Sequence, residues 1–345
     1  MRGLRTSRAG ATSRGRTALV AALIASDRAV LVAAVTALAL LAVGCGGGAS
    51  APPPASGGSA GGTAAAPAAA PPAADVASSG GPRLAHIFVI VDENKAASEI
   101  VGSSQAPFIN TLIARSALAT DYSALFHPSL PNYIALIAGS NQGITSDQSP
   151  DPAALLTVPS IADRIAASGR TWKAYAEDLP ASGDAGADSG RYAVRHEPFV
   201  YLRDVGQNTP SLRTHVVDFG RLSSDLHSPA TTPDFAFITP NLCNDMHDCP
   251  VSVGDRWLSR VVPMILHSAA FRTTPSLLVL TWDEGSASDN HVATILAGNS
   301  VKPGYRSGRP YDHYSLLRTI EAAWGLAPLT ANDAGAQAMG EFLKP

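Results

Sequence analysis

Two short acidic clusters stand at the ends of strongly apolar runs. The run 84–91 leads into DEN at 92–94, and the run 276–282 leads into DE at 283–284. Oxygen-bearing side chains at a strand end are costly to bury unless they form hydrogen bonds, pair with a charge or bind a metal ion. Such oxygens suit Ca²⁺, Mg²⁺ or Mn²⁺, and carboxylates also bind Zn²⁺. We expect the two clusters together to hold a divalent cation, although either alone is also typical of a surface turn or a helix start.

Ser129 is a further group that could do chemistry. It lies at a turn between Pro128 and Pro131, next to a helical pattern at 130–139. A hydroxyl at a helix start meets backbone N–H donors and the positive end of the helix dipole, which favour a phosphate dianion and an alkoxide. Serine is also an ordinary helix N-cap. The pattern alone therefore leaves both roles open, nucleophile and cap.

Four histidines border polar clusters in the sequence. His127 precedes Ser129 by two residues, and the others are His196, His247 and His313. Histidines in such positions can bind phosphate, ligate a metal or protonate a leaving group. The sequence contains no glycine-rich phosphate loop and no G-x-S-x-G turn, which argues against a nucleotide-binding fold and a lipase-like enzyme.

Apolar runs alternate with helical patterns from residue 83 onward. The predicted strands are 84–91, 171–176, 234–239, 276–282 and 292–298, and the predicted helices are 106–117, 130–139, 159–169, 254–268 and 313–325. This alternation predicts an α/β fold in which a mostly parallel central sheet carries helices on both faces. Ligands bind outside the carboxyl ends of the strands in such sheets, so the polar clusters should converge on one edge.

The N-terminal part of the chain has the features of export. Five arginines within residues 2–16 precede two apolar stretches, and the second, at 29–43, is short for a membrane span and suits a signal peptide. The stretch runs into LAVGC, which resembles a lipobox with Cys45 as the lipid-bearing residue. We expect a signal peptide at 1–45, a disordered Ala/Gly/Pro/Ser spacer at 46–82 and one folded domain at 83–345. The protein is expected to be exported and anchored at a membrane surface by the lipid, or otherwise to be secreted.

Charge and cysteine content narrow the function further. The formal net charge is −3 and no basic run occurs beyond the leader, so we expect no nucleic-acid partner. Cys243 and Cys249 lie six residues apart in NLCNDMHDC. In an oxidising compartment a disulfide between them is the leading interpretation, and a thiolate metal site is disfavoured because no second cysteine pair exists.

Several segments in the same order resemble the phosphoesterase family of the alkaline phosphatase superfamily. They are VDENKAASEIVGSSQAPFINTL, HPSLPNYIALIAGS, AEDLP, YAVRHEP, TPNLCNDMHD, GDRWL, LTWDE and DHYSLLRTIEAAWGL. The family includes phospholipases C and secreted acid phosphatases, and the short acid phosphatases that act on phosphatidylinositol 3-phosphate are especially similar. The resemblance covers about residues 84–325 and implies an alkaline-phosphatase-like fold.

The resemblance also implies a single-metal phosphoesterase with a covalent phosphoenzyme. The implied metal ligands are Glu93, Asn94, Asp283 and Glu284, and the cation is Ca²⁺, Mg²⁺, Mn²⁺ or Zn²⁺. The implied catalytic residues are Ser129 as nucleophile, His247, Asp248 and His313, and we assign His127, Asn132 and His196 to substrate binding. A bound cation lowers the pKa of a serine hydroxyl, and histidine can donate a proton to the leaving alkoxide.

The expected function is a metal-dependent phosphomonoesterase, an acid phosphatase that takes phosphoinositides or other small phosphate esters. The runner-up is a phospholipase C-type phosphodiesterase, which is disfavoured because larger members of that type carry C-terminal domains and this chain stops soon after its last predicted helix. A surface lipoprotein that binds without turnover would predict a lost nucleophile or a broken acidic pair, and neither is seen. A sulfatase is disfavoured because SLPNY lacks the arginine of the C/S-x-P-x-R motif.

Overall fold

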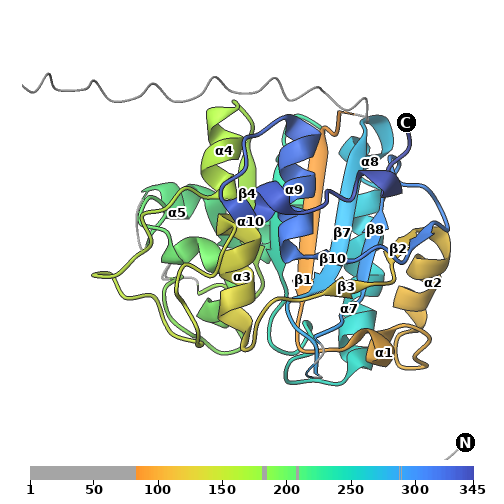
Figure 1. Cartoon of the computed structure of the whole chain (residues 1–345), viewed down its shortest axis with the longest axis horizontal. Helices are drawn as coiled ribbons and strands as arrows, with labels where there is room; N and C mark the ends of the chain where they lie inside the picture. The colour runs from red at the N-terminus through yellow and green to blue at the C-terminus, as the bar shows by residue number, and fades with distance from the viewer. Residues whose placement is uncertain (1–82, 181–184, 207–209, 287, 289) are drawn as a thin grey trace, which may run out of the picture. The chain divides into compact units, whose positions relative to one another are not determined.

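The apolar runs form a central sheet in the computed structural model of the protein (Figure 1). Five strands match the predicted ones: β1 (His86–Asp92), β4 (Trp172–Ala176), β6 (Phe235–Thr239), β7 (Ser276–Trp282) and β8 (Thr294–Ala297). The sheet also contains the short strands β2 (Ala117–Ala119), β5 (Val216–Asp218) and β9 (Arg306–Ser307), in the order β5-β4-β6-β1-β7-β8-β2-β9. Two further short strands, β3 (Tyr122–Ser123) and β10 (Tyr311–Asp312), pair in a sheet of their own. The predicted strands are confirmed.

The structure describes residues 83–345 apart from 181–184, 207–209, 287 and 289. All of these fall in one unit, Pro71–Pro345. Within this part of the chain no helix has the length and apolar character needed to cross a membrane. The predicted signal peptide at 1–45, with Cys45, and the predicted spacer at 46–82 lie outside the described residues.

The direction of the strands explains why they are apolar throughout. β1 runs parallel to both β6 and β7, and β4 runs parallel to β5 and β6. β8 is antiparallel to β7 and β2. Every residue of β1 and β7 is buried, because a parallel sheet is covered on both faces, so the middle of each strand is apolar. The polar residues of these strands lie at or next to their ends: His86, Asp92, Ser276 and Thr281. The predicted α/β fold with a mostly parallel central sheet is confirmed.

Helices cover both faces of this sheet, as predicted. They are α1 (Ala97–Ile100), α2 (Pro107–Arg115), α3 (Ser129–Ala138), α4 (Ile161–Ala167), α5 (Pro210–His215), α6 (Leu222–Asp225), α7 (Val251–Leu266), α8 (Ala269–Thr273), α9 (His313–Trp324) and α10 (Ala331–Gly335). Short 3₁₀ helices span Val194–His196, Pro198–Tyr201, Phe219–Arg221 and Gly340–Phe342. In Figure 1, α3 and α9 pack together in front of the strands, whereas α7, which packs against α2 and α8, lies behind them.

The register of the strands sets the two acidic clusters side by side. In the pairing of β1 with β7, Asp92 lies opposite Trp282. The next residues, Glu93 and Asp283, therefore follow at the same level on neighbouring strands. Because strands alternate faces, these two side chains also share a face. The sheet itself brings the clusters together.

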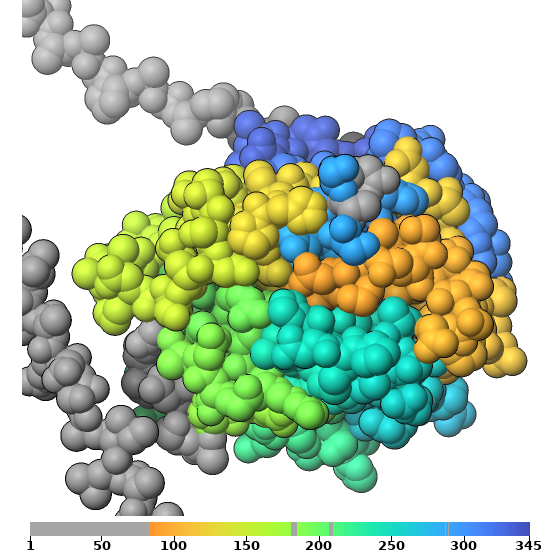
Figure 2. Space-filling model, turned by 90° about the horizontal axis from the view of Figure 1, so that it is seen from below, coloured from red at the N-terminus to blue at the C-terminus, as the bar shows by residue number. Residues whose placement is uncertain are grey.

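The loops that follow these strands meet at the same edge. Figure 2 looks onto this edge, and the orange residues after β1 lie between the teal segment that leads into α7 and the blue segment after β7. Lys95, in the loop after β1, donates a hydrogen bond of 2.9 Å from Nζ to the carbonyl of Met246 in the loop after β6. Ala97 donates its N–H to the carbonyl of His291 at 2.9 Å. Segments distant in sequence are thus tied together around the ends of the strands.

Asp255 of α7 supplies a cap that α2 lacks. The N-cap residue of α2 is Ala106, which has no side chain able to accept a hydrogen bond. Asp255 Oδ1 accepts the N–H of Ile109 at 2.9 Å, and Oδ2 accepts that of Phe108 at 3.2 Å. A negative charge is favourable at a helix N-terminus. The buried carboxylate therefore joins α2 to α7.

We predict that Asp255→Ala lowers the free energy of unfolding by about 1–3 kcal/mol, because two N–H groups of α2 lose their acceptor. Urea unfolding followed by circular dichroism measures this change. Arg256→Ala is the matched control, since Arg256 is the exposed neighbour on the same helix. Equal stability of the two variants would contradict the role of Asp255 as a cap.

Candidate active site

Glu93 lies at the centre of a buried polar cluster at the end of β1. Its Oε1 accepts a hydrogen bond of 2.7 Å from the hydroxyl of Tyr133. Its Oε2 accepts one of 3.0 Å from Ser129 Oγ and one of 2.7 Å from Asn94 Nδ2. His196 Nε2 lies 3.2 Å from Oε1. Both carboxylate oxygens are therefore engaged, and Glu93 is fully buried.

Ser129 and Tyr133 reach Glu93 from one face of α3. Ser129 is the first residue of the helix and Tyr133 follows four residues later, which is one turn along the axis. Both side chains are buried. The backbone N–H of Leu130, the next residue, donates to Asp147 Oδ1 at 3.0 Å. Ser129 thus lies at the start of the helix that the sequence predicted.

Asp283 and Asp245 add two more buried carboxyl groups. Asp283 Oδ1 accepts the backbone N–H of Asn94 at 3.1 Å, and its Oδ2 has no hydrogen-bond partner among the described residues. Asp245 Oδ1 accepts the backbone N–H of His247 at 2.8 Å, and its Oδ2 lies 3.4 Å from His196 Nδ1. His196 therefore lies between two carboxyl groups, those of Glu93 and Asp245.

Removal from water dominates the electrostatics of these carboxyls. Burial, with the charges of Asp283 and Asp245 nearby, raises the pKa of Glu93 well above its ordinary value. Burial and then the charge of Glu284 raise the pKa of Asp283 to about 8, and burial raises the pKa of Asp245 to about 7. Among the described residues, no lysine or arginine forms an ion pair with Glu93 or Asp283. The cluster gathers acidic groups without a protein cation to match them.

These donors fit a divalent cation. Glu93 and Asp283 supply buried carboxylate oxygens, one of which is unmatched, and Asn94 adds an amide group beside them. Hard divalent cations prefer oxygen ligands of this kind. In the part of the chain that the structure describes, no three His, Cys, Asp or Glu side chains are arranged as a closed set of metal ligands. The ligand set therefore stays a prediction.

Glu284 is turned toward His127. Its Oε2 lies 3.0 Å from His127 Nδ1, and the side chain of His127 is 46% exposed. Burial, with the charge of Asp147, raises the pKa of Glu284 to about 7. The structure thus places this predicted metal ligand beside a predicted substrate-binding residue, at the rim of the cluster.

His196 and His313 have different surroundings. Burial, with the positive charges of Arg195 and His247, lowers the pKa of His196, and its ring stacks on that of Tyr133 at 5.3 Å between centroids. His313 Nε2 lies 2.7 Å from the carbonyl oxygen of Asp283, and its Nδ1 lies 3.0 Å from the hydroxyl of Tyr122. Burial lowers the pKa of His313 to about 4. The two nitrogens of His313 thus contact the residue after β7 and Tyr122 of β3, whereas His196 touches Glu93 itself.

His247 lies at a more accessible position. Its Nδ1 is 2.7 Å from Asp248 Oδ1, and its Nε2 is 3.3 Å from the guanidinium of Arg195. Arg195 Nε is in turn 3.6 Å from Asp147 Oδ2. Arg195 and Asp147 line a recess of about 200 Å³. The predicted pair of His247 and Asp248 is therefore formed, and Arg195 joins it.

Asn132, predicted to bind substrate, supports the loop ahead of Ser129. Its Oδ1 accepts the N–H groups of Leu125 at 3.0 Å and Phe126 at 2.9 Å, and its Nδ2 donates to the carbonyl of Phe126 at 2.9 Å. Asn132 is fully buried. Both polar atoms of its side chain are thus bonded to the backbone, and these contacts fix the path of the chain into α3.

The disulfide expected between Cys243 and Cys249 is present, with 4.7 Å between the Cα atoms. It closes the loop that carries Asp245 and His247. Met246, between these two, has a positive φ of 76°. The loop therefore directs Asp245 into the cluster and His247 toward the rim.

Three residues of the cluster were missed in the sequence. Tyr133 lies at i+4 from Ser129, and helical spacing alone could have placed it on the same face. Asp245 precedes His247 by two residues and could have been included with it. Arg195 gives no such signal, because it comes from a 3₁₀ helix that only the tertiary structure brings to His247.

Comparison with known proteins identifies the family of this chain. The phosphoesterase family matches residues 88–327. The phosphatidylinositol-3-phosphatase of Mycobacterium tuberculosis is 37% identical over 252 residues, 73% of this chain and 80% of that protein. The phosphate-repressible acid phosphatase of Penicillium chrysogenum is 32% identical over 243 residues, 66% of this chain and 57% of the fungal protein. The chain thus spans little more than half the length of this fungal relative.

Solved structures share the fold at low sequence identity. A protein of the alkaline phosphatase superfamily from Vibrio parahaemolyticus gives a TM-score of 0.51 at 12% identity, over 73% of this chain and 69% of that chain. Murine ectonucleotide pyrophosphatase/phosphodiesterase 5 gives a TM-score of 0.52 at 10% identity, over 75% of this chain and 100% of that chain. The predicted alkaline-phosphatase-like fold is confirmed.

We predict that Asn132→Ala lowers the free energy of unfolding by about 1–3 kcal/mol, because the N–H groups of the preceding loop lose a buried acceptor. Urea unfolding measures the loss. Asn141→Ala is the control, because Asn141 is partly exposed just beyond α3 and among the described residues its side chain makes only two hydrogen bonds, to the carbonyl of Ile144 at 2.9 Å and from the N–H of Gly143 at 3.4 Å. A smaller loss for Asn132→Ala than for the control would show that the loop does not depend on this side chain.

Proposed function

Because the chain belongs to the phosphoesterase family, we propose that it is a metal-dependent phosphomonoesterase in which Ser129 attacks phosphorus and forms a phosphoserine intermediate. One observation carries the proposal: Ser129 Oγ, buried at the first residue of α3, donates a hydrogen bond of 3.0 Å to Glu93 Oε2. A serine hydroxyl is a weak nucleophile unless a base or a cation activates it. Glu93 lies where it can orient the hydroxyl and accept its proton.

The relatives indicate the class of substrate. One is named a phosphatidylinositol-3-phosphatase, and several fungal relatives are named acid phosphatases. We extend to this chain the activity that these names share, hydrolysis of phosphoric esters. The substrate is then a phosphate monoester, either a phosphoinositide headgroup or another small phosphate ester.

The side chains around Glu93 have separate roles in this reaction. A bound divalent cation would neutralise phosphoryl oxygens and lower the pKa of the attacking hydroxyl. Tyr133 and His196 hold the carboxylate of Glu93 in place. The backbone N–H groups and the dipole at the start of α3 favour negative charge next to Ser129.

Proton transfer to the leaving group belongs to His247. Its side chain is 32% exposed, so a substrate can reach it, and Asp248 fixes its Nδ1. Nε2 then carries the transferred proton: it gives the proton to the leaving alkoxide in the first step and takes one from the attacking water in the second. In the structure the guanidinium of Arg195 donates to this nitrogen, so Arg195 has to turn to the phosphoryl group of a bound substrate before Nε2 can carry the proton.

The export signals complete the proposal. We infer that the signal peptide at 1–45 directs export and that Cys45 carries a lipid, with 46–82 as a spacer. An anchor of this kind would hold the enzyme near lipid substrates at a membrane surface. Release of the protein from membranes by Cys45→Ala would support the anchor.

We predict that Ser129→Ala abolishes both phosphoenzyme formation and release of phosphate from p-nitrophenyl phosphate, because among the described residues the other hydroxyl bonded to Glu93, that of Tyr133, lies one turn further along α3. Acid quench with a radiolabelled phosphate ester measures the phosphoenzyme. Ser140→Ala, just beyond the other end of α3, is the control and should react normally. Substantial turnover by Ser129→Ala would refute the nucleophile, and preference for bis(p-nitrophenyl) phosphate would assign a phosphodiesterase instead.

We predict that addition of a divalent cation to the chelated protein releases about one proton or more at pH 7, because carboxyls with a raised pKa must ionise to bind it. Asp283, with a pKa near 8, is largely protonated at pH 7 and ionised at pH 9, so the release should fall as the pH rises through 8. Titration calorimetry in buffers of different ionisation enthalpy counts these protons.

Two variants show whether the cation binds at the buried cluster or at other carboxylates of the protein. Asp283→Asn should reduce both the affinity for the cation and the number of protons released. Asp151→Asn, at an exposed position, should change neither. Binding without proton release, or unchanged binding by Asp283→Asn, would count against a cation at this site.

A further inference from the structure

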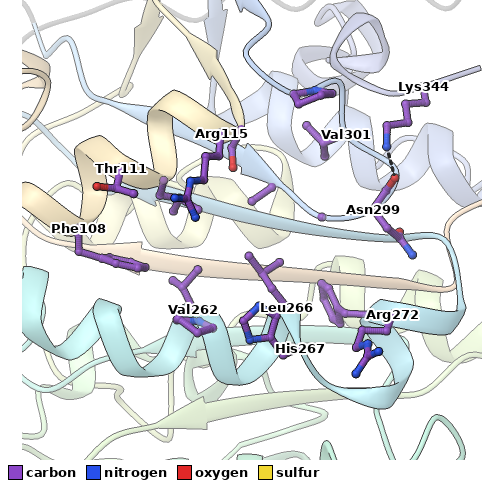
Figure 3. A pocket seen from close by; sticks show the side chains of 17 residues that line it. Phe108, Thr111, Arg115, Val262, Leu266, His267, Arg272, Asn299, Val301 and Lys344 are labelled. Atoms are coloured by element: carbon purple, nitrogen blue, oxygen red, sulfur yellow. Dashed lines mark hydrogen bonds between the residues drawn. The ribbon is translucent and has the colours of Figure 1, made fainter.

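A cavity of about 570 Å³ opens between α2, α7 and the chain that follows β8 (Figure 3). Its walls are largely apolar and include Leu112 of α2, Val262 and Leu266 of α7, Phe271 of α8, and Val301. Pockets for small molecules range over about 300–1,000 Å³ and are lined mainly by such side chains. The cavity therefore has the size and the lining of a ligand site.

The rim of this cavity is basic. Arg115, His267, Arg272 and Lys344 line it and are exposed, and its lining contains neither Asp nor Glu. Among the described residues, Arg115 and Arg272 have no carboxylate partner. Lys344 Nζ donates a hydrogen bond of 2.7 Å to the carbonyl of Asn299, which holds its charge at the rim (Figure 3). The guanidinium groups of Arg115 and Arg272 are thus exposed to solvent, with no carboxylate among the described residues to neutralise them.

β7 separates the cavity from the catalytic cluster. Asn299 in the lining accepts the N–H of Ser276, the first residue of β7, at 2.9 Å. Asp283 follows the opposite end of that strand. At about 3.3 Å per residue, the two ends are about 20 Å apart. Glu93, Ser129 and Asp283 are not among the residues that line the cavity.

We propose that this cavity is a second, non-catalytic binding site for an anionic amphiphile, with one alkyl chain against the apolar walls and a carboxylate or phosphate head at Arg272. The head is placed at one guanidinium group because Arg115 lies across the cavity from Arg272 (Figure 3). Guanidinium groups pair with carboxylate and phosphate through two parallel hydrogen bonds. A small inorganic anion would leave the apolar walls in water. A neutral hydrocarbon would leave Arg272 without a counter-charge, so only a molecule with both parts uses the walls and the rim together.

Binding of dansyl-undecanoic acid to the full-length protein, followed by fluorescence, tests the proposal. We expect saturable binding at one site per chain, displaced by dodecanoate or dodecylphosphonate but not by dodecanol. The phosphonate is used because it lacks a hydrolysable ester. The better of the two displacers distinguishes a fatty-acid head from a phosphate head.

Variants locate the bound probe. Arg272→Glu should weaken binding about fivefold or more, because repulsion replaces attraction at the head. Leu266→Trp should weaken it by filling the cavity without a change of charge. Arg260→Glu is the matched control, since Arg260 is an exposed residue of α7 outside the lining, and it should bind the probe normally.

Turnover of p-nitrophenyl phosphate should be equal in these variants, which separates this proposal from the catalytic one. An absence of saturable binding would overturn the second site, as would equal displacement by dodecanol or an equal loss in Arg260→Glu. Self-association in sedimentation, disrupted by Leu266→Trp and unaffected by the probe, would assign the face to a second copy of the chain and overturn the proposal too.

Discussion

Carboxyl groups held out of water at the end of a parallel sheet are the constraint on which this structure depends. Glu93 and Asp283 follow paired strands in register, and burial raises the pKa of each. Unpaired buried charges cost several kcal/mol, so the surroundings must compensate. The hydroxyls of Ser129 and Tyr133 and the groups of Asn94 do so in part. Such a cluster is poorly suited to stability and well suited to binding a cation and a phosphoryl group.

Much of this arrangement could be predicted from the sequence. Strong apolar runs identified every long strand, and the acidic residues directly after β1 and β7 indicated the edge at which they meet. Because ligands bind at the carboxyl ends of parallel strands, the acidic clusters after β1 and β7 could be predicted to form one site. The prediction succeeded because the apolar runs mark where the strands end, whereas the register that sets Glu93 beside Asp283 is seen only in the structure.

The direction of individual side chains could not be predicted in the same way. The sequence cannot show that Asn132 turns back onto its own loop, that Glu284 pairs with His127, or that both nitrogens of His313 are occupied. Each of these depends on contacts between segments more than five residues apart. The short strands β5 and β9 were missed for a related reason, because two or three residues carry no periodic pattern.

The disulfide between Cys243 and Cys249 connects the architecture of the site to the place where the protein folds. Asp245, His247 and Asp248 all lie inside the loop that it closes. A reducing cytoplasm opposes this bond, whereas an oxidising exterior favours it. A chain still inside the cell would therefore hold its central acidic residues on a rigid sheet while this loop lacked its covalent closure. Under the export proposed above, maturation of the site would be coupled to transport, which would spare phosphorylated metabolites of the producing cell from premature hydrolysis.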